Sequence, residues 1–507
     1  MADAALSRAA TRAGLVVAAV ALAGGVVAVN RLLVGVFYDD GLYAGLALAL
    51  ARGAGYVHPH LPGAPAAIHY PPLYPLVLAP LFGLLPLDAA ALAGKVLNLL
   101  LAATGAGLIA WHAVRVEVLG PAAPRWLAPT VVAAAALAIP SLAMQAVLFA
   151  EPLFVVLLVL AVAWADLPPA GWSPGRATLL AGAAAALALL TRSIGVAAGA
   201  GIVVFLFLVR GASFRLLVRA AVPVALAAVG WGAWLARHGA GLDPALALNY
   251  GSYGEVIRQT GLAAFGVSAP DLPRPLAAIT LGWVPSLPLF LVIAGAALAI
   301  LIYGLILLCR RSSGGFTLLG YLAILALWPY PPDRFLWAVL PWLALAWAAG
   351  AVALWRGRMR IAVGVVAACL AVGYATYEVR GYAHRWWEGA ARDISENFTE
   401  LLPWVRTLPA NAVVATDDEA LVWLYSGRRA VPLYLYAYHG RNTVEPDPAT
   451  HRAYLERQGV THVLLGSPSG DAARELHALL VAYPHWLSGV QRWPGGRWAF
   501  AVTPDVH

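Results

Sequence analysis

Charged residues and cysteines are scarce in this chain. Asp, Glu, Lys and Arg make up 11% of its 507 residues, whereas 61% are hydrophobic. A soluble globular protein of this length carries far more charge, so the composition excludes that class and indicates a polytopic membrane protein. The two cysteines, Cys309 and Cys369, lie in or beside apolar segments, so neither a disulfide framework nor a cysteine metal site is expected.

Lysine is almost absent, since Lys95 is the single one, and the net charge of +8 therefore comes from arginine. In a soluble protein such a charge would suggest nucleic acid. Here the arginines gather in short loops between apolar segments, so we expect membrane lipids and no nucleic acid as partners. The alanine- and arginine-rich, lysine-poor composition suggests a high-GC bacterium, and hence the bacterial plasma (inner) membrane.

Apolar runs predict a mainly α, multi-pass membrane protein with about eleven spans. The expected spans are 14–36, 92–112, 127–147, 150–165, 177–191, 194–209, 219–236, 281–308, 316–329, 335–355 and 361–377, with 73–87 as an interfacial helix. The first run is longer than a signal peptide and lacks a convincing cleavage site, so it reads as a retained span. With a cytoplasmic N-terminus, every arginine-dense short loop falls inside and the C-terminus falls outside.

The chain divides into two expected domains. Residues 1–378 form the membrane domain, including a first outer loop at 37–91 with interfacial helices. Residues 379–507 alternate strand and helix patterns and predict a small extracytoplasmic α/β domain with a mostly parallel sheet. Within this domain, Asp417-Asp418-Glu419 follows a strand, where it fits either a metal or sugar site or a helix N-cap.

An acidic pair, Asp39-Asp40, follows the first span directly. Two adjacent carboxylates at a partly dehydrated interface repel each other, which raises at least one pKa and suits a proton acceptor. Asp is also an ordinary turn residue, so a solvated loop start is the alternative interpretation.

Ionisable groups also stand at the expected outer ends of other spans. Lys95, Glu151, Arg192 and Arg334 are costly at such depth and usually functional. Three cations converging at outer-leaflet depth would make a site for a lipid phosphate or pyrophosphate, with arginine offering two parallel hydrogen bonds. Each of them alone could instead reach toward lipid headgroups.

Tyrosines, prolines and histidines crowd the first loop. The tyrosines fit either an aromatic belt at headgroup depth or a platform for a sugar or lipid headgroup. Three histidines, His58, His60 and His69, have zinc-ligand chemistry, but prolines break their spacing. We therefore expect no required cofactor; a divalent metal is compatible with the sequence but is not indicated.

Short motifs along the whole chain resemble one family. They are Asp39-Asp40-Gly41-Leu42-Tyr43-Ala44, Ala51-Arg52-Gly53, Tyr70-Pro71-Pro72-Leu73-Tyr74-Pro75, Ala150-Glu151-Pro152-Leu153-Phe154, Leu190-Thr191-Arg192 and Pro332-Asp333-Arg334-Phe335-Leu336. In order and placement they resemble the C-type integral-membrane glycosyltransferases (GT-C), which include protein O-mannosyltransferases and aminoarabinose transferases of lipid A. The family's second acid is often glutamate, whereas here it is Asp40.

The resemblance implies inverting transfer of a sugar from a polyprenyl-phosphate donor to an acceptor hydroxyl at the outer face. Asp39 would be the general base and Asp40 its catalytic partner. Substrate would be bound by Lys95, Glu151, Arg192, Arg334, Tyr43 and Tyr70. The acceptor could be a lipid, a glycan or a protein, and the sugar stays open. The alternatives are a secondary transporter or lipid-linked sugar flippase with an outer domain, and a non-catalytic subunit or sensor; transporters, however, place ionisable groups near the midplane.

Overall fold

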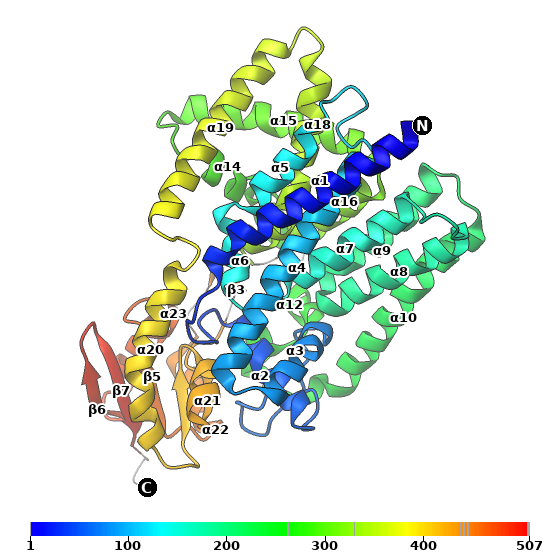
Figure 1. Ribbon diagram of the computed structural model, residues 1–507. Helices are drawn as coiled ribbons and strands as arrows, with labels where there is room; N and C mark the ends of the chain where they lie inside the picture. The colour runs from blue at the N-terminus through cyan, green and yellow to red at the C-terminus, as the bar shows by residue number, and fades with distance from the viewer. Residues whose placement is uncertain are drawn as a thin grey trace.

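The protein is a bundle of helices with a small sheet at one end, as the computed structural model shows (Figure 1). The structure describes residues 2–260, 263–328, 330–436, 438–439, 442–443 and 446–503. About 70% of the chain is helical. The mainly α class with a C-terminal α/β part, predicted from the sequence, is confirmed.

Several helices are long and apolar enough to cross a bilayer. In the described part of the chain there are six, or seven if one bent pair counts as a single span. The six helices are α1 (Ala2–Gly25), α4 (Leu87–Arg115), α8 (Pro174–Thr191), α10 (Phe214–His238), α15 (Leu287–Arg311) and α19 (Arg360–Ala383). The chain is thus a multi-pass membrane protein, while the count of eleven spans stays a prediction.

Shorter helices complete the bundle. They are α3 (Leu73–Leu84), α7 (Glu151–Asp166), α9 (Val196–Leu208), α16 (Ser313–Ala326), α17 (Asp333–Ala338) and α18 (Leu340–Trp355). The expected span 127–147 is a pair, α5 (Leu127–Ala136) and α6 (Ile139–Ala146), bent by 50°. Pro140 lies at the start of α6, where its missing N–H is tolerated at a helix start but not in a helix interior.

The first helix ends earlier than predicted. The expected span 14–36 is helical as α1 to Gly25, followed by one 3-10 turn, η1 (Val26–Ala28). Beyond it, the Asn30 side chain donates to the carbonyls of Ala28 and Ala146 and accepts from the N–H of Leu32. An amide side chain that serves the backbone in this way competes with helix continuation.

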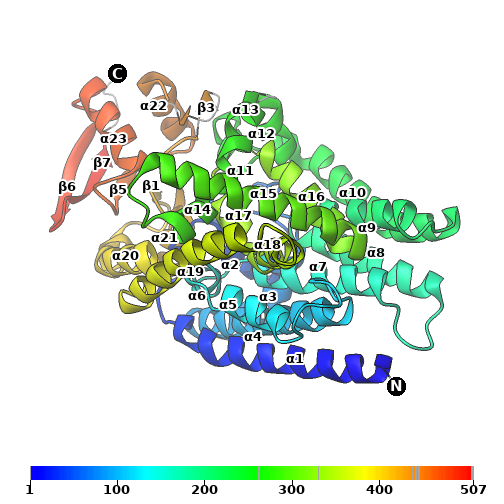
Figure 2. The same cartoon turned by 90° about the horizontal axis from the view of Figure 1, so that it is seen from above.

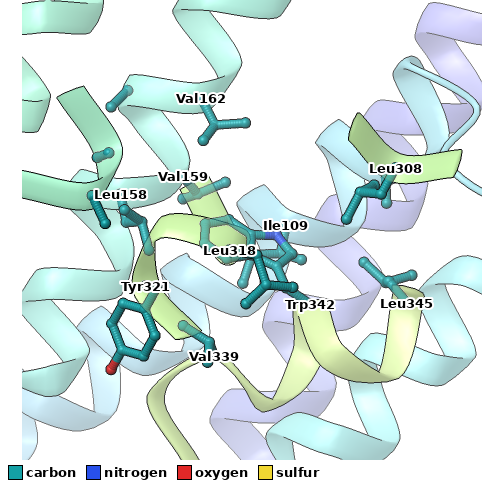
Figure 3. Close-up of a cluster of buried hydrophobic side chains, with 14 of the residues drawn as sticks. Ile109, Leu158, Val159, Val162, Leu308, Leu318, Tyr321, Val339, Trp342 and Leu345 are labelled. Atoms are coloured by element: carbon teal, nitrogen blue, oxygen red, sulfur yellow. The ribbon is translucent and has the colours of Figure 1, made fainter. Parts of the chain in front are cut away.

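Small residues allow close packing inside the bundle. Helix α1 lies along α4, where Gly14 and Gly107 face each other, and a side chain at either position would collide with its neighbour (Figure 2). The same holds for Gly304 of α15 against α18. Such contacts are the usual basis of helix association in lipid. Figure 3 shows a part of the core in which Ile109, Leu158, Leu318, Tyr321 and Trp342 from four helices meet.

The C-terminal sheet has five strands in the order β2-β1-β5-β7-β6. The strands are β1 (Val413–Thr416), β2 (Arg429–Pro432), β5 (His462–Leu465), β6 (Leu487–Trp493) and β7 (Arg497–Val502). The pairs β1–β2 and β1–β5 are parallel, whereas β5–β7 and β6–β7 are antiparallel. The prediction of a mostly parallel sheet is therefore right for one half. It missed β6, whose middle residues are exposed and lack an apolar alternation.

Helices of the C-terminal part flank this sheet. They are α20 (Gly389–Thr407), α21 (Glu419–Ser426), α22 (Pro448–Arg457) and α23 (Asp471–Ala482). A two-stranded ribbon, β3 (Tyr438–His439) with β4 (Asn442–Thr443), lies apart from the main sheet. Because α19 continues to Ala383, the expected boundary at 378 falls inside a helix, and the two-domain division stays a prediction.

Two segments that precede α15 reach the sheet end of the bundle. Helix α2 (Asp39–Ala51) packs on α21, where Gly41 approaches the Ala420 side chain (Figure 1). Tyr425 of α21 also receives a hydrogen bond from the Val34 N–H at 3.1 Å. The long loop before α15 folds into short helices, α11 (Ala247–Tyr250), α12 (Tyr253–Thr260), α13 (Ala263–Asp271) and α14 (Pro273–Leu281).

Candidate active site

A cavity of about 760 Å³ lies where these segments meet. Five parts of the chain line it: the start of α2, the first loop, the segment 248–275, the turn 328–335 and the C-terminal part. Its wall includes Asp39, His69, Tyr70, Asn249, Tyr253, Asp271, Arg274, Trp328, Tyr330, Asp333, Arg334, Tyr436 and Asp471. The size is that of a small-molecule site, and ionisable and aromatic groups converge on it.

Asp39 is the first residue of α2 and its carboxylate accepts two strong hydrogen bonds. The Tyr70 hydroxyl donates to Oδ1 at 2.7 Å, and the Arg334 guanidinium donates to Oδ2. Burial raises the pKa of Asp39, but Arg334 and Tyr70 outweigh it and hold that pKa below its ordinary value. The residue before it, Tyr38, has φ of +49°, a strained conformation of the kind found at functional sites.

Behind Arg334 lies a second carboxylate, Glu151, the first residue of α7. Its Oε1 is 2.8 Å from Arg334 Nε and 2.5 Å from an Nη of Arg192, which follows α8. The Glu151 side chain is 1% exposed, compared with 7% for Arg192 and 21% for Arg334. Two acids and two arginines thus form one nearly buried, charge-balanced cluster, here called the Asp39–Arg334–Glu151–Arg192 cluster.

Two phenylalanines cover the guanidinium groups of this cluster. Arg334 lies 4.4 Å from the ring centre of Phe149, and Arg192 lies 4.9 Å from that of Phe335. Aromatic faces attract cations and exclude water, so the arginines are fixed and poorly hydrated. Such preorganised donors in a dry site stabilise an anion better than the same groups in water.

Asp40, predicted as a catalytic partner, has a different environment. Its side chain is fully buried, and its two oxygens accept the backbone N–H groups of Gly35 at 3.0 Å and Phe37 at 2.9 Å. Burial raises the pKa of Asp40, while these backbone bonds oppose the shift. Asp40 therefore shapes the turn that presents Asp39, and does not line the cavity.

Lys95, predicted to join the arginines, also lies elsewhere. Its ammonium donates to Asn30 Oδ1 at 2.7 Å and to the Leu32 carbonyl at 2.9 Å, and it is 1% exposed. It thus anchors the segment between η1 and α2. Of the three predicted cations, the structure brings together Arg192 and Arg334.

Tyr43 and Tyr70 stand beside the cluster. Tyr43, one turn after Asp39, packs its ring 4.9 Å from Tyr70 and 5.0 Å from Tyr74, and is 1% exposed. With Thr191, Arg192 and Trp328, both tyrosines line a small side pocket. Tyr70 therefore has a place in the site through Asp39, whereas Tyr43 supports the ring stack.

The three first-loop histidines are buried, and the rings of His58 and His60 lie 5.5 Å apart and both pack on Tyr250. His69 Nδ1 lies 2.7 Å from the Gly251 carbonyl, and His60 Nε2 lies 2.9 Å from the Tyr250 hydroxyl. Burial lowers the pKa of His60 to about 3, so the ring is neutral at physiological pH. In the described ranges, no group of three or more His, Cys, Asp or Glu side chains has metal-site geometry. That no cofactor is required stays a prediction.

The acidic run after β1 has mainly structural contacts. Asp417 accepts the N–H of Gly466 at 2.9 Å, and Asp418 at the N-cap of α21 makes no side-chain cap bond. Glu419 accepts a hydrogen bond from Tyr250, which joins the C-terminal part to α11. Burial raises the pKa of Glu419 to about 7.

Sequence reasoning missed the part of the wall contributed by Asn249, Tyr253 and Trp328. Tyr38 donates to the Asn249 carbonyl at 3.0 Å, and Tyr253 stacks on Trp328 at 4.7 Å between ring centres. The aromatic residues that precede Arg334 were a usable signal, because aromatics in a proline-rich turn next to a functional arginine mark a binding loop. Nothing in the local sequence distinguished Asn249 from an ordinary loop residue.

No protein-family model and no curated protein matches the sequence. Among solved structures, the chain is similar to ArnT from Cupriavidus metallidurans bound to undecaprenyl phosphate, at 17% identity and a TM-score of 0.48 over 97% of this chain and 98% of that one. It is also similar to the oligosaccharyltransferase AglB from Archaeoglobus fulgidus in complex with an inhibitory peptide and a dolichol-phosphate. The identity is 12% and the TM-score 0.49, over 97% of this chain and 75% of that one. Both of these proteins are GT-C glycosyltransferases, the group that the sequence motifs resemble.

Proposed function

We propose that this protein is a glycosyltransferase that moves a sugar from a polyprenyl phosphate to an acceptor hydroxyl. One arrangement carries the proposal: Asp39 and Arg334 line a single cavity, and the buried Arg192 is joined to Arg334 through Glu151. A general base must reach the acceptor proton, and cations must stabilise the phosphate that departs. Asp39 and the pair Arg192 and Arg334 have the chemistry for these two roles.

In the proposed reaction, the acceptor oxygen attacks the anomeric carbon from the face opposite the phosphate. The new carbon–oxygen bond forms as the bond from that carbon to the phosphate oxygen breaks, which inverts the configuration. The electron pair of the broken bond stays on the phosphate, where the arginines offset the added charge. The acceptor proton passes to Asp39, so the products are the glycosylated acceptor and the polyprenyl phosphate. The leaving group is a lipid monophosphate, so this route requires no divalent metal.

The same proposal includes the setting of the reaction. The positive-inside pattern supports a cytoplasmic N-terminus and an extracytoplasmic sheet domain. The arginine-rich, lysine-poor composition supports a bacterial plasma membrane. The cavity lies at the sheet end of the bundle, so in this topology the transfer takes place at the outer face.

The test is transfer by the purified protein in lipid nanodiscs. Polyprenyl-phosphate sugars such as those of mannose, arabinofuranose and galacturonic acid are offered with membrane extracts as acceptor. Mass spectrometry then follows consumption of the sugar lipid and release of the polyprenyl phosphate. Asp39→Asn should slow release by about a hundred- to ten-thousand-fold, because loss of a general base typically costs that much. Wild-type turnover by Asp39→Asn would refute the assignment, and movement of an intact sugar lipid across the membrane of proteoliposomes would indicate a flippase.

A further inference from the structure

The base that the proposed function requires is held by another group in this structure. Each oxygen of Asp39 accepts one hydrogen bond, Oδ1 from Tyr70 and Oδ2 from Arg334. A carboxylate paired with a guanidinium is a weak base, because the cation stabilises its charged form. For Asp39 to take a proton from an acceptor, its contact with Arg334 has to loosen.

The four charges of the cluster decide which contact gives way. Glu151 and Asp39 balance Arg192 and Arg334, so the cluster has no spare positive charge for a further anion. Glu151 is 1% exposed and binds both arginines, whereas the Asp39 side chain is 13% exposed and touches one of them. An anion that arrives from the cavity therefore meets Arg334 at its Asp39 side and leaves its Glu151 side in place.

We infer that the donor phosphate and Asp39 compete for Arg334, so that the base is released only once the donor has bound. This inference rests on the proposed function and adds the order of binding to it. Glu151 acts as the positioning residue, since it holds Arg334 and Arg192 while the partner of Arg334 changes from carboxylate to phosphate. The freed Oδ2 then faces the cavity and accepts the acceptor proton.

Two consequences follow for the reaction. The donor binds before the acceptor can be activated, so the resting enzyme does not deprotonate an acceptor without a sugar to transfer. When the phosphate has taken Arg334, the carboxylate also loses the partner that lowers its pKa, and it becomes a stronger base at the step that needs one.

The test is the affinity for a product lipid, undecaprenyl phosphate, measured on the full-length protein in nanodiscs. Asp39→Asn removes the competitor, so it should bind the lipid phosphate about tenfold more tightly than the wild type, although it cannot transfer sugar. Asp39→Ser should give the same gain, which covers any distortion caused by the amide. The control is Asp88→Asn, an equal charge change at an exposed position of α4 outside the cavity, which should stay within about twofold.

The outcomes separate this inference from the function on which it rests. In an Arg334→Ala background, Asp39→Asn should give no gain, because there is no shared arginine left. If both Asp39 variants bind the lipid phosphate no more tightly than Asp88→Asn, the competition is refuted while the transferase assignment stands. If the wild type and every variant fail to bind undecaprenyl phosphate better than undecaprenol, the proposed function falls as well.

Discussion

Replacing Glu151 by Gln tests whether this acid holds the cluster together. The substitution keeps the size of the side chain but removes its charge, while Arg192 lies 2.5 Å and Arg334 Nε 2.8 Å from Oε1. Losing one partner of a buried ion pair costs about 3–5 kcal/mol, because an uncompensated charge stays behind. Arg334 keeps Asp39 and is partly exposed, so the loss falls mostly on Arg192. We therefore expect the free energy of unfolding to fall by about 3 kcal/mol, near the lower end of that range.

The assay measures the midpoint of unfolding in detergent, with tryptophan fluorescence as the signal. Glu255→Gln is the control, because its partner Arg258 is 75% exposed and such a pair contributes at most about 1 kcal/mol. Undecaprenyl phosphate should raise the midpoint of Glu151→Gln more than that of the wild type, since the phosphate supplies the missing negative charge. Equal midpoints for Glu151→Gln and Glu255→Gln would contradict a buried, charge-balanced cluster.

Three further predictions concern other parts of the molecule. Arg334→Ala should weaken binding of the polyprenyl phosphate, or slow its departure, by about tenfold or more. Arg334→Lys should recover only part of the lost affinity or rate, because a point charge replaces a planar fork. A lipid-binding assay measures the affinity and a single-turnover assay measures the departure. Lys95→Met should cost about 1–3 kcal/mol of stability by leaving Asn30 Oδ1 and the Leu32 carbonyl without their donor, yet change lipid-phosphate affinity less than about twofold. A loss of affinity as large as that of Arg334→Ala would instead place Lys95 in the phosphate site. Glu419 has a pKa of about 7 in the folded protein and near 4.5 when unfolded, so between these pH values the folded state binds one proton more than the unfolded state. As pH rises from 5 to 7, the free energy of unfolding of the wild type should therefore fall, on the order of 2 kcal/mol relative to that of Glu419→Gln. Parallel curves of stability against pH for the two proteins would disprove the shift.

The membrane helices and the acidic pair were predictable because their signals are local. The length of an apolar run indicates a span, and a carboxylate directly after such a run can be recognised from the sequence alone. Predicting the partners was harder, because Asp39 and Arg334 are separated by 295 positions. Depth in the membrane placed Lys95, Arg192 and Arg334 at one level. It did not show that the lysine turns toward Asn30 while the two arginines share Glu151.

The details that the sequence could not supply depend on competition between side chain and backbone. Asp40 is next to Asp39 and chemically identical, yet it binds two N–H groups of the preceding turn. The early end of α1 likewise depends on Asn30 finding the Ala146 carbonyl on another helix. Both outcomes require knowing which unsatisfied backbone groups lie nearby in space, which a periodic pattern does not record.

Under the proposed function, the contribution of Tyr436 and Asp471 to the cavity wall would tie substrate choice to the C-terminal part of the chain. A molecule that fills this cavity touches residues from both ends of the sequence at once. If this cavity holds the acceptor, as proposed, substitutions at Tyr436 and Asp471 would alter which acceptors are accommodated and leave the cluster at Asp39 in place. Under the proposed function and topology, acceptor preference could then diversify in the C-terminal part, free of the packing constraints that lipid imposes on the helices.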